Sequence, residues 1–164
     1  MFTFEPSNQS SSTKVERYQL LAQQLSSLLA GESDLIANAA NMSALVYHQV
    51  EGLNWCGFYL FDGKELVLGP FQGKVACVRI ALGRGVCGTA ASMREVQVVK
   101  NVHDFPGHIA CDVASQSEIV IPLIKNDQLI GVWDVDSPYV ARFDNDDKEG
   151  MLTLCKIFLD SLHS

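Results

Sequence analysis

The chain has 164 residues, of which 48% are hydrophobic and 19% are charged. This composition is typical of one folded domain and excludes an intrinsically disordered chain. Twelve basic and 19 acidic residues give a formal net charge of -7, which argues against nucleic acid and anionic membrane surfaces as partners. Domains of this length bury roughly 70% of their unfolded surface, so no disulfide framework is needed for stability.

The N-terminal segment carries no recognisable targeting signal. Its first residues, MFTFEPSNQSSSTK, lack the basic start and the apolar run of a signal peptide. The sequence contains no stretch of about 18 apolar residues that would predict a membrane span. We therefore expect a cytoplasmic protein, whose five cysteines are mostly thiols in a reducing compartment. Residues 1–13 are rich in Ser, Gln and Asn and are expected to form a flexible tail ahead of a single domain at 14–164.

Two helices are predicted first. Over 14–30, leucines and one tyrosine recur at helical spacing until Gly31, which is typical of a helix end. A second helix is predicted over about 34–51, with Ser33 as its N-cap and Gly52 at its C-terminal end.

The middle of the chain is rich in strand patterns. The predicted strands are 55–61, 64–71, 75–82, 95–100, 119–124 and 128–136. Asp62-Gly63 and Asn126-Asp127 separate neighbouring strands by the short turns that are typical of hairpins. The segment GRGVCGTAASM, residues 83–93, indicates a glycine-rich loop that enters a short helix.

A final helix is predicted from about 145 to 162. Asp144 is its expected N-cap, and Asp147 at the third helical position completes a capping box. Helices at both ends of a strand-rich middle with short hairpins predict an α+β fold. We expect a central antiparallel sheet of about six strands, with the N- and C-terminal helices packed on one face.

Three carboxylates are predicted to meet at one end of the last hairpin. Asp134 and Asp136 are two residues apart in GVWDVDSP, so they share one face of their strand with Val132. Glu118 opens the partner strand at nearly the same distance from the turn as Asp136, so the two should be near-opposite. Clustered carboxylates raise the pKa of at least one member. A neutral member can donate a proton while the remaining charge holds a substrate ammonium; the alternative is a solvated sheet end.

The cysteines fall into different environments. Cys56 and Cys155 lie within apolar runs and are expected to be core residues. Cys111 lies in the polar stretch HDFPGHIACDVASQSEIVIP, seven residues before Glu118, and can reach the mouth of a site lined by the acids. His108 would favour its thiolate if the segment forms a helical turn. The alternatives are a bystander thiol and a solvated loop histidine.

Two other chemistries are disfavoured. Cys77, Cys87 and Cys111, with His103 or His108, could supply zinc ligands, but there is no CxxC motif and no paired short spacing. We expect no metal. GRGVCG lacks the Lys-Ser/Thr of a phosphate-binding loop and the strand-GxGxxG-helix context.

Several segments together resemble one family. NWCGFYLF, GRGVCGTAA, NVHDFPGHIACD, SEIVIPL and GVWDVDSP are similar, in order and spacing, to segments of the free methionine-R-sulfoxide reductases, which are stand-alone GAF-domain enzymes. The resemblance runs from about residue 33 to residue 160. It implies a GAF-like fold, a homodimer and reduction of free methionine sulfoxide. The preference for the R epimer follows from the resemblance alone.

The resemblance also implies residue roles. Cys111 matches the catalytic cysteine, Cys77 the resolving cysteine, and Cys87 a third cysteine that can join disulfide exchange. Trp55 and Tyr59 match the aromatic residues that close over the methyl-sulfur end of the substrate. The acidic substrate-site residues correspond to Glu118, Asp134 and Asp136.

These roles predict a mechanism. The Cys111 thiolate attacks the sulfoxide sulfur, and an acid, Asp136 or Glu118, donates a proton to the oxygen. Cys111 is left as sulfenic acid and condenses with Cys77, directly or through Cys87. Thioredoxin, supplied by NADPH through thioredoxin reductase, reduces the disulfide, so no bound cofactor is expected.

Other charges of the acid cluster would pair the free α-ammonium, which a methionine inside a peptide lacks. Backbone N–H groups around Ile109 and Ala110 could bind the carboxylate. The main alternative is a ligand-sensing GAF module without catalysis. We expect that no effector domain is attached, and this expectation argues against a sensing role. A zinc-bound structural protein is the other alternative.

Overall fold

The computed structural model describes residues 3, 12–109 and 113–163. In chain order its elements are α1 (Lys14–Leu29), α2 (Leu35–Gln49), β1 (Trp55–Phe61), β2 (Glu65–Gly73), β3 (Arg79–Ala81), α3 (Gly85–Met93), β4 (Gln97–Val99), the 3-10 turn η1 (Val102–Asp104), β5 (Ser117–Lys125), β6 (Gln128–Ser137) and α4 (Asn145–Ser161). None of these helices is both long enough and apolar enough to cross a membrane.

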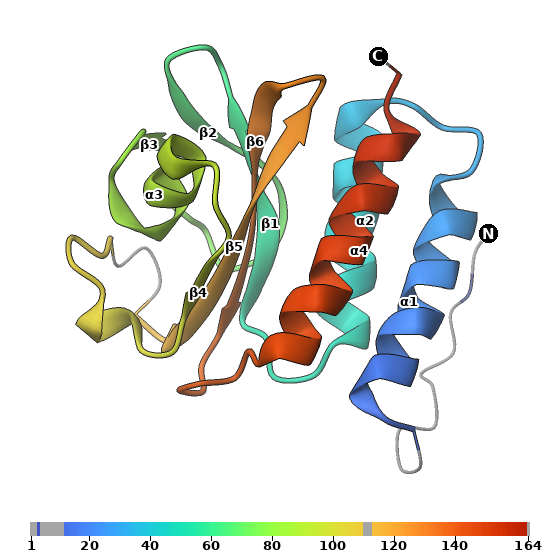
Figure 1. Cartoon of the computed structure of the whole chain (residues 1–164), viewed down its shortest axis with the longest axis horizontal. Helices are drawn as coiled ribbons and strands as arrows, with labels where there is room; N and C mark the ends of the chain where they lie inside the picture. The colour runs from blue at the N-terminus through green and yellow to red at the C-terminus, as the bar shows by residue number, and fades with distance from the viewer. Residues whose placement is uncertain (1–2, 4–11, 110–112, 164) are drawn as a thin grey trace.

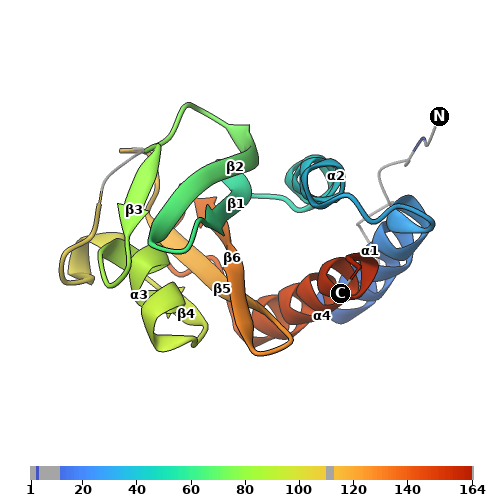
Figure 2. The ribbon, with the colours of Figure 1, turned by 90° about the horizontal axis from the view of Figure 1, so that it is seen from above.

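The strands form one antiparallel sheet of six strands in the order β3-β2-β1-β6-β5-β4. Helices α1, α2 and α4 lie on one side of this sheet, and α3 lies on the other (Figures 1 and 2). The predicted α+β fold, with the N- and C-terminal helices on one face, is therefore confirmed. The sheet has a helical layer behind it and a thinner layer, built around α3, in front.

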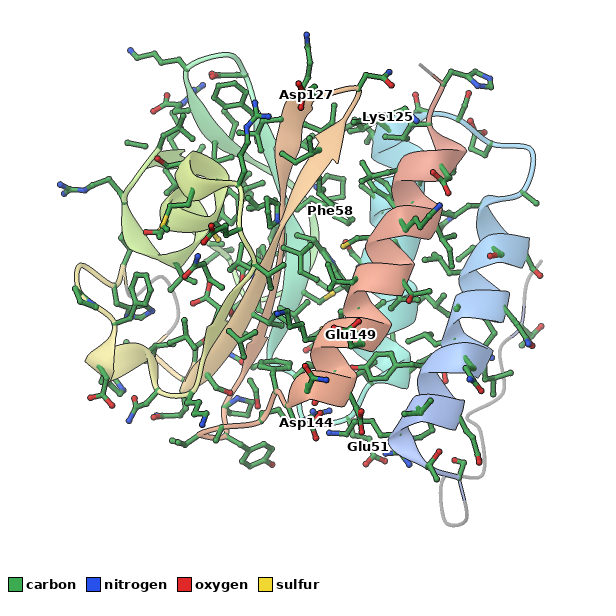
Figure 3. All side chains as sticks on the ribbon, in the orientation of Figure 1. Glu51, Phe58, Lys125, Asp127, Asp144 and Glu149 are labelled. Carbon is green, nitrogen blue, oxygen red and sulfur yellow. The ribbon has the colours of Figure 1, made fainter. Side chains whose placement is uncertain are left out.

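The layer of terminal helices covers a large aromatic core. Phe58 of β1 packs against Trp133 of β6 and Phe158 of α4, with ring centroids 6.4 and 4.8 Å apart. Phe58 lies between the sheet and the helices (Figure 3). On α1, residues at helical spacing form the buried stripe, with Leu25 fully buried. Successive side chains of β6 point to opposite faces of the sheet, so Trp133 lies on the side of the terminal helices and Val132 and Asp134 lie on the α3 side.

An ionic network joins the two ends of the chain. The Tyr18 hydroxyl of α1 donates to the buried Asp147 carboxylate of α4 at 2.7 Å. Lys14 and Arg142 pair with the same carboxylate at 2.9 and 3.2 Å. Asp147 also completes the predicted capping box with Asp144, which is confirmed. Asp144 lies at the start of α4 (Figure 3). Two cations and a hydroxyl thus compensate one buried charge.

The other helix starts differ in part from expectation. Thr13, assigned to the tail by composition, is the N-cap of α1 and forms a capping box with Glu16. For α2 the predicted Ser33 cap is wrong, because the Asp34 side chain accepts the hydrogen bond from the Ala37 N–H at 2.8 Å. A carboxylate at this position also interacts favourably with the positive end of the helix dipole, which explains the preference for Asp34 over the preceding serine.

The third strand is shorter than predicted. Of the predicted strand 75–82, only Arg79–Ala81 forms β3 and pairs with β2. The Val78 carbonyl still accepts a hydrogen bond from the Leu68 N–H at 2.9 Å, but residues 75–77 lie outside the sheet, with Val75 88% exposed. This segment includes Cys77, whose carbonyl oxygen accepts a hydrogen bond from the Tyr59 hydroxyl at 2.9 Å. The apolar alternation of 75–82 satisfies a strand pattern locally, but the side chains at its start find no sheet partner. Cys77 therefore lies on a loop beside β1.

Candidate active site

The three acids meet on the face of the sheet opposite the terminal helices. Glu118 of β5 pairs with Asp136 of β6, which confirms the near-opposite placement expected from the hairpin, and a register shift between Leu123 and Ile124 makes the pairing direct. On the other side of β6, Trp55 and Gly57 of β1 pair with Asp136 and Asp134. The antiparallel register thus places two carboxylates of one strand between a third carboxylate and an aromatic strand.

The acid cluster is buried. Glu118 and Asp134 are each only 6% exposed. Burial raises the pKa of Glu118 above its usual value. Burial also raises the pKa of Asp134, and repulsion from Asp136 and Glu118 raises it further. The expected upward pKa shift in this cluster is confirmed, and the alternative of a solvated sheet end is wrong.

Cys87 completes the cluster from the α3 side. Its sulfur lies 3.9 Å from Oε1 of Glu118. The close approach of α3 depends on Gly88, where an added Cβ would lie 2.5 Å from the carbonyl oxygen of Ala81. Burial and the repulsion of Asp134, Glu118 and then Asp136 raise the pKa of the Cys87 thiol well above its usual value. Cys87 is therefore a neutral thiol at physiological pH.

An aromatic wall stands beside the acids. The Trp55 ring stacks on Tyr59 and on Phe71 of β2, with centroids 5.9 and 5.2 Å apart. Two hydrogen bonds fix its polar atoms: Trp55 Nε1 donates to the Lys74 carbonyl at 3.1 Å, and the Tyr59 hydroxyl donates to the Cys77 carbonyl. The wall therefore presents apolar ring faces next to Glu118, Asp134 and Asp136.

Six of the predicted site residues line a single pocket: Trp55, Tyr59, Cys87, Glu118, Asp134 and Asp136. Arg84 and Ser115, which no sequence pattern singled out, line the same pocket. Arg84 lies three residues before Cys87 in the glycine-rich segment. Its closeness in sequence to a predicted site cysteine could have indicated that it lies near the site. Ser115 has no motif of its own and is placed by the fold, where its hydroxyl accepts a hydrogen bond from Asn54 at 3.0 Å.

Comparison with known proteins identifies the family. A family model described as the GAF domain matches residues 34–158. The chain is 52% identical over 141 residues to the free methionine-R-sulfoxide reductase of Escherichia coli (strain K12), covering 86% of each chain. The chain belongs to the free methionine-R-sulfoxide reductase family. The resemblance seen in its sequence motifs is thereby confirmed.

Solved structures of family relatives agree with this fold. A free methionine-R-sulfoxide reductase from Neisseria meningitidis, in complex with its substrate, is 42% identical with a TM-score of 0.91, covering 98% of this chain and 95% of that one. A protein from Burkholderia vietnamiensis described as a putative GAF sensor is 65% identical with a TM-score of 0.89, covering 92% and 96%.

The redox cysteines expected from the family are described only in part. Cys77 is disulfide-bonded and lies on the loop before β3. Cys111 and Ala110 lie outside the described residues, so the Cys77–Cys111 pairing stays a prediction. Cys56 and Cys155 are buried free thiols of the helix-side core, as predicted.

His108 does not supply the positive charge considered for it. It lines the pocket, but burial and the nearby His103 lower its pKa, which keeps the imidazole neutral at neutral pH. The helical turn in this region is η1, which ends at Asp104, before His108. Among the described residues, Arg84 is the one pocket-lining side chain with a permanent positive charge.

The cluster also has the composition of a metal site. Cys87, Glu118 and Asp134 each offer one ligand atom, and these atoms all lie within 4.8 Å of one another. This set differs from the cysteines and histidines weighed as zinc ligands from the sequence. It combines one sulfur and two carboxylate oxygens, a donor set that zinc accepts.

Proposed function

We propose that this protein reduces free methionine-R-sulfoxide to methionine in the cytoplasm, using thiols of its own chain. The observation that carries the proposal is the buried acid cluster beside the aromatic wall, in a chain of this family. The wall contacts the apolar methyl-sulfur end of the substrate. The acids bind its polar end and supply a proton. Ligand sensing alone would need neither a proton donor nor redox cysteines.

The acids favour a free amino acid over a peptide. Glu118 and Asp134 are buried, and no ion pair among the described residues neutralises either of them. A substrate α-ammonium would supply the missing positive charge, and desolvated charges interact strongly. A methionine sulfoxide within a peptide has no ammonium at this position, so it would leave the acids uncompensated.

Arg84 is our candidate for the other end of the substrate. It lines the same pocket, and its guanidinium can form two parallel hydrogen bonds with a carboxylate. Arg84 also immediately precedes α3, whose first N–H groups donate no hydrogen bond to a capping side chain. These N–H groups could therefore donate to the same substrate carboxylate. Cationic and anionic ends of the free amino acid would thus meet opposite charges.

The proton is held by the coupled pair Glu118 and Asp134. Burial raises the pKa of both groups, which favours the protonated form of the pair. We assign the donation to Glu118, a donor candidate from the sequence whose buried carboxyl has a raised pKa. The Cys111 thiolate takes the oxygen as it attacks the sulfoxide sulfur. One thiolate, one sulfoxide and one proton give Cys111 sulfenic acid and methionine.

Recycling needs a second thiol and an external reductant. Cys77 condenses with the sulfenic acid, forming a disulfide and releasing water. Thioredoxin, reduced by NADPH through thioredoxin reductase, then returns both cysteines to thiols. The raised pKa of Cys87 makes it a slow nucleophile, so it joins the exchange only as a secondary partner. We expect the working form to be a homodimer without a bound cofactor.

The test is turnover with defined substrates. Thioredoxin, its reductase and NADPH are supplied, and loss of NADPH absorbance is followed with four substrates: free R and S methionine sulfoxide and both epimers with acetylated, amidated ends. We expect turnover of the free R epimer alone. No turnover of any of them, with the cysteines shown to be reduced, would refute the reductase proposal and favour the ligand-sensing alternative.

Single variants separate the steps. Cys111→Ser should abolish methionine formation, whereas Cys77→Ser should form one methionine per chain and then stop with thioredoxin. Dithiothreitol should partly restore cycling of Cys77→Ser. Normal thioredoxin-dependent cycling of that variant would exclude Cys77 as the resolving cysteine.

Arg84→Gln tests the carboxylate contact. It should raise KM for free methionine sulfoxide more than it lowers kcat, because the contact is present in both ground and transition states. Arg84→Lys, which keeps the charge, is the matched control and should recover part of the loss. An unchanged KM in Arg84→Gln would place the carboxylate elsewhere.

A further inference from the structure

The spacing of the buried thiol and acids suits a small thiophilic cation. In tetrahedral zinc sites, bond lengths of about 2.3 Å to sulfur and about 2.1 Å to oxygen place neighbouring ligand atoms about 3.5 Å apart. The Cys87 sulfur and Glu118 Oε1 are 3.9 Å apart, and the Asp134 oxygen lies within 4.8 Å of both. A shift of a few tenths of an ångström in flexible side-chain atoms brings the first pair to the zinc spacing.

The ligand atoms come from three separate elements that hold them in place. Cys87 lies on α3, Glu118 on β5 and Asp134 on β6. The two strands are paired from Ser117 to Lys125 with one register shift between Leu123 and Ile124, and α3 packs on them through small buried side chains. The trio therefore exists before any ion binds, and little ordering is required on binding.

Asp134 provides an independent sign that the cluster accepts a cation. Its carboxyl is almost fully buried, yet its Oδ1 finds no hydrogen-bond partner among the described residues. Buried acceptors without partners are uncommon in native proteins. Asp134 lines the pocket with Cys87 and Glu118, so an ion or an ammonium bound there could supply the missing partner.

We propose that Cys87, Glu118 and Asp134 form an inhibitory zinc site that overlaps the position of the substrate ammonium. The sulfur ligand selects zinc and similar thiophilic ions over magnesium or calcium, which prefer oxygen ligands alone. Zinc deprotonates the thiol that it binds, so Cys87 becomes a thiolate only in the metal-bound form. Occupation of the site excludes the substrate and removes the proton that the acids would donate. The overlap with the substrate rests on the proposed function, whereas the metal site does not.

The test measures zinc binding directly, by calorimetric titration of the full chain with zinc chloride. Cys77→Ser/Cys111→Ser serves as the parent, because the expected redox pair then offers no thiol to the metal and no turnover occurs. We expect one zinc per chain in this parent. Adding Cys87→Ser or Asp134→Asn should each weaken the affinity at least about tenfold. Cys155→Ser, which removes a buried free thiol of the other core, is the matched control and should bind zinc like the parent.

A second readout guards against loss of folding in the variants. Cadmium replaces zinc as a probe, and its thiolate charge-transfer absorbance should appear in the parent and in Cys155→Ser but not in Cys87→Ser. Thermal melting shows that each protein tested is folded. Absence of metal binding in the parent, or binding that survives both Cys87→Ser and Asp134→Asn, overturns the metal site.

Competition tests the inhibitory role. Methionine-R-sulfoxide stays intact in the parent, and it should weaken the apparent zinc affinity in proportion to its concentration. Zinc binding that the sulfoxide leaves unchanged overturns the overlap with the ammonium position. A wild-type chain that binds zinc at this site but reduces no sulfoxide would refute the reductase proposal alone.

Discussion

Gly57 is the position where the aromatic wall is most sensitive to one added atom. It lies between Trp55 and Tyr59 on β1 and pairs with Asp134. A Cβ at Gly57 would lie 2.3 Å from Cβ of Phe71 and 2.8 Å from Cη2 of Trp55. Ordinary contacts begin at 3.4 Å, so Gly57→Ala must move Phe71 by about 1 Å, together with its strand, and must displace the Trp55 ring.

The expected consequences are a loss of stability and a larger loss of activity. Overpacking of this kind costs about 1–3 kcal/mol of unfolding free energy. A displacement of about 1 Å in a positioning group lowers the rate by about 100-fold. We therefore expect kcat/KM for free methionine-R-sulfoxide to fall about 100-fold in Gly57→Ala at a temperature where the variant is fully folded. Urea denaturation and steady-state kinetics on the same preparation measure the two effects.

Gly150→Ala is the matched control. Its Cβ would lie 2.2 Å from Cγ of Tyr18, in the contact between α1 and α4 on the far side of the sheet. This variant should lose a similar amount of stability while the folded protein keeps the wild-type kcat/KM. Equal kcat/KM in Gly57→Ala and wild type would refute the role of the wall in positioning the substrate. An equal loss in both glycine variants would show that the effect is general destabilisation.

Three further predictions concern stability. Because the pKa values of Glu118 and Asp134 are raised, the native protein binds more protons than the unfolded chain, and the free energy of unfolding should fall as pH rises above about 4. Urea titrations at about pH 5 and 8 should show this slope, and Asp134→Asn should reduce it; a slope of the opposite sign would contradict the burial argument. The hydrogen bond from Lys14 lowers the pKa of Asp144 to about 2, so the contribution of Asp144 to the free energy of unfolding is present above about pH 4 and is lost as pH falls towards 2. Asp144→Ala should cost about 1 kcal/mol at neutral pH and remove this acid dependence, as measured by urea denaturation. Leu25→Ala, at a fully buried position, should cost about 2–5 kcal/mol with unchanged KM, and a change in KM would link the helical layer to the site.

Much of the site followed from local sequence patterns. The period-two alternation of GVWDVDSP placed Asp134 and Asp136 on one face, and the two-residue turn at Asn126-Asp127 pairs Lys125 with Gln128 and Ile124 with Leu129. A register shift between Leu123 and Ile124, which no sequence pattern indicated, then brings Glu118 opposite Asp136. Both turn residues have positive φ values of 50° and 64°, which Asn and Asp tolerate better than most residues. The alternation and the turn each depend on residues that are close in sequence, so the sequence alone is enough to predict them.

The length of β3 and the cap of α2 were not predictable in this way. Residues 75–82 carry a strand-like pattern, yet only Arg79–Ala81 pairs with β2. A pattern shows that a segment can form a strand, but a partner strand at the right place decides whether it does. At the start of α2, Ser33 and Asp34 are both suitable caps by type, and the position at which the helix begins selects Asp34.

Burial of the acids was the property that only the tertiary structure decided. From the sequence, the same carboxylates fit a solvated sheet end. The α3 layer covers them, and it can approach because Gly88 has no side chain to collide with Ala81. Phe71 joins the aromatic wall because β2 pairs with β1, and Ser115 lines the pocket from the segment before β5; no motif indicated either residue. Sequence thus determined that Asp134 and Asp136 share a face, whereas the pairing of Glu118 with Asp136 depends on a register shift within the hairpin. The burial of the acids, and with it their raised pKa values, depends on distant segments that cross that face.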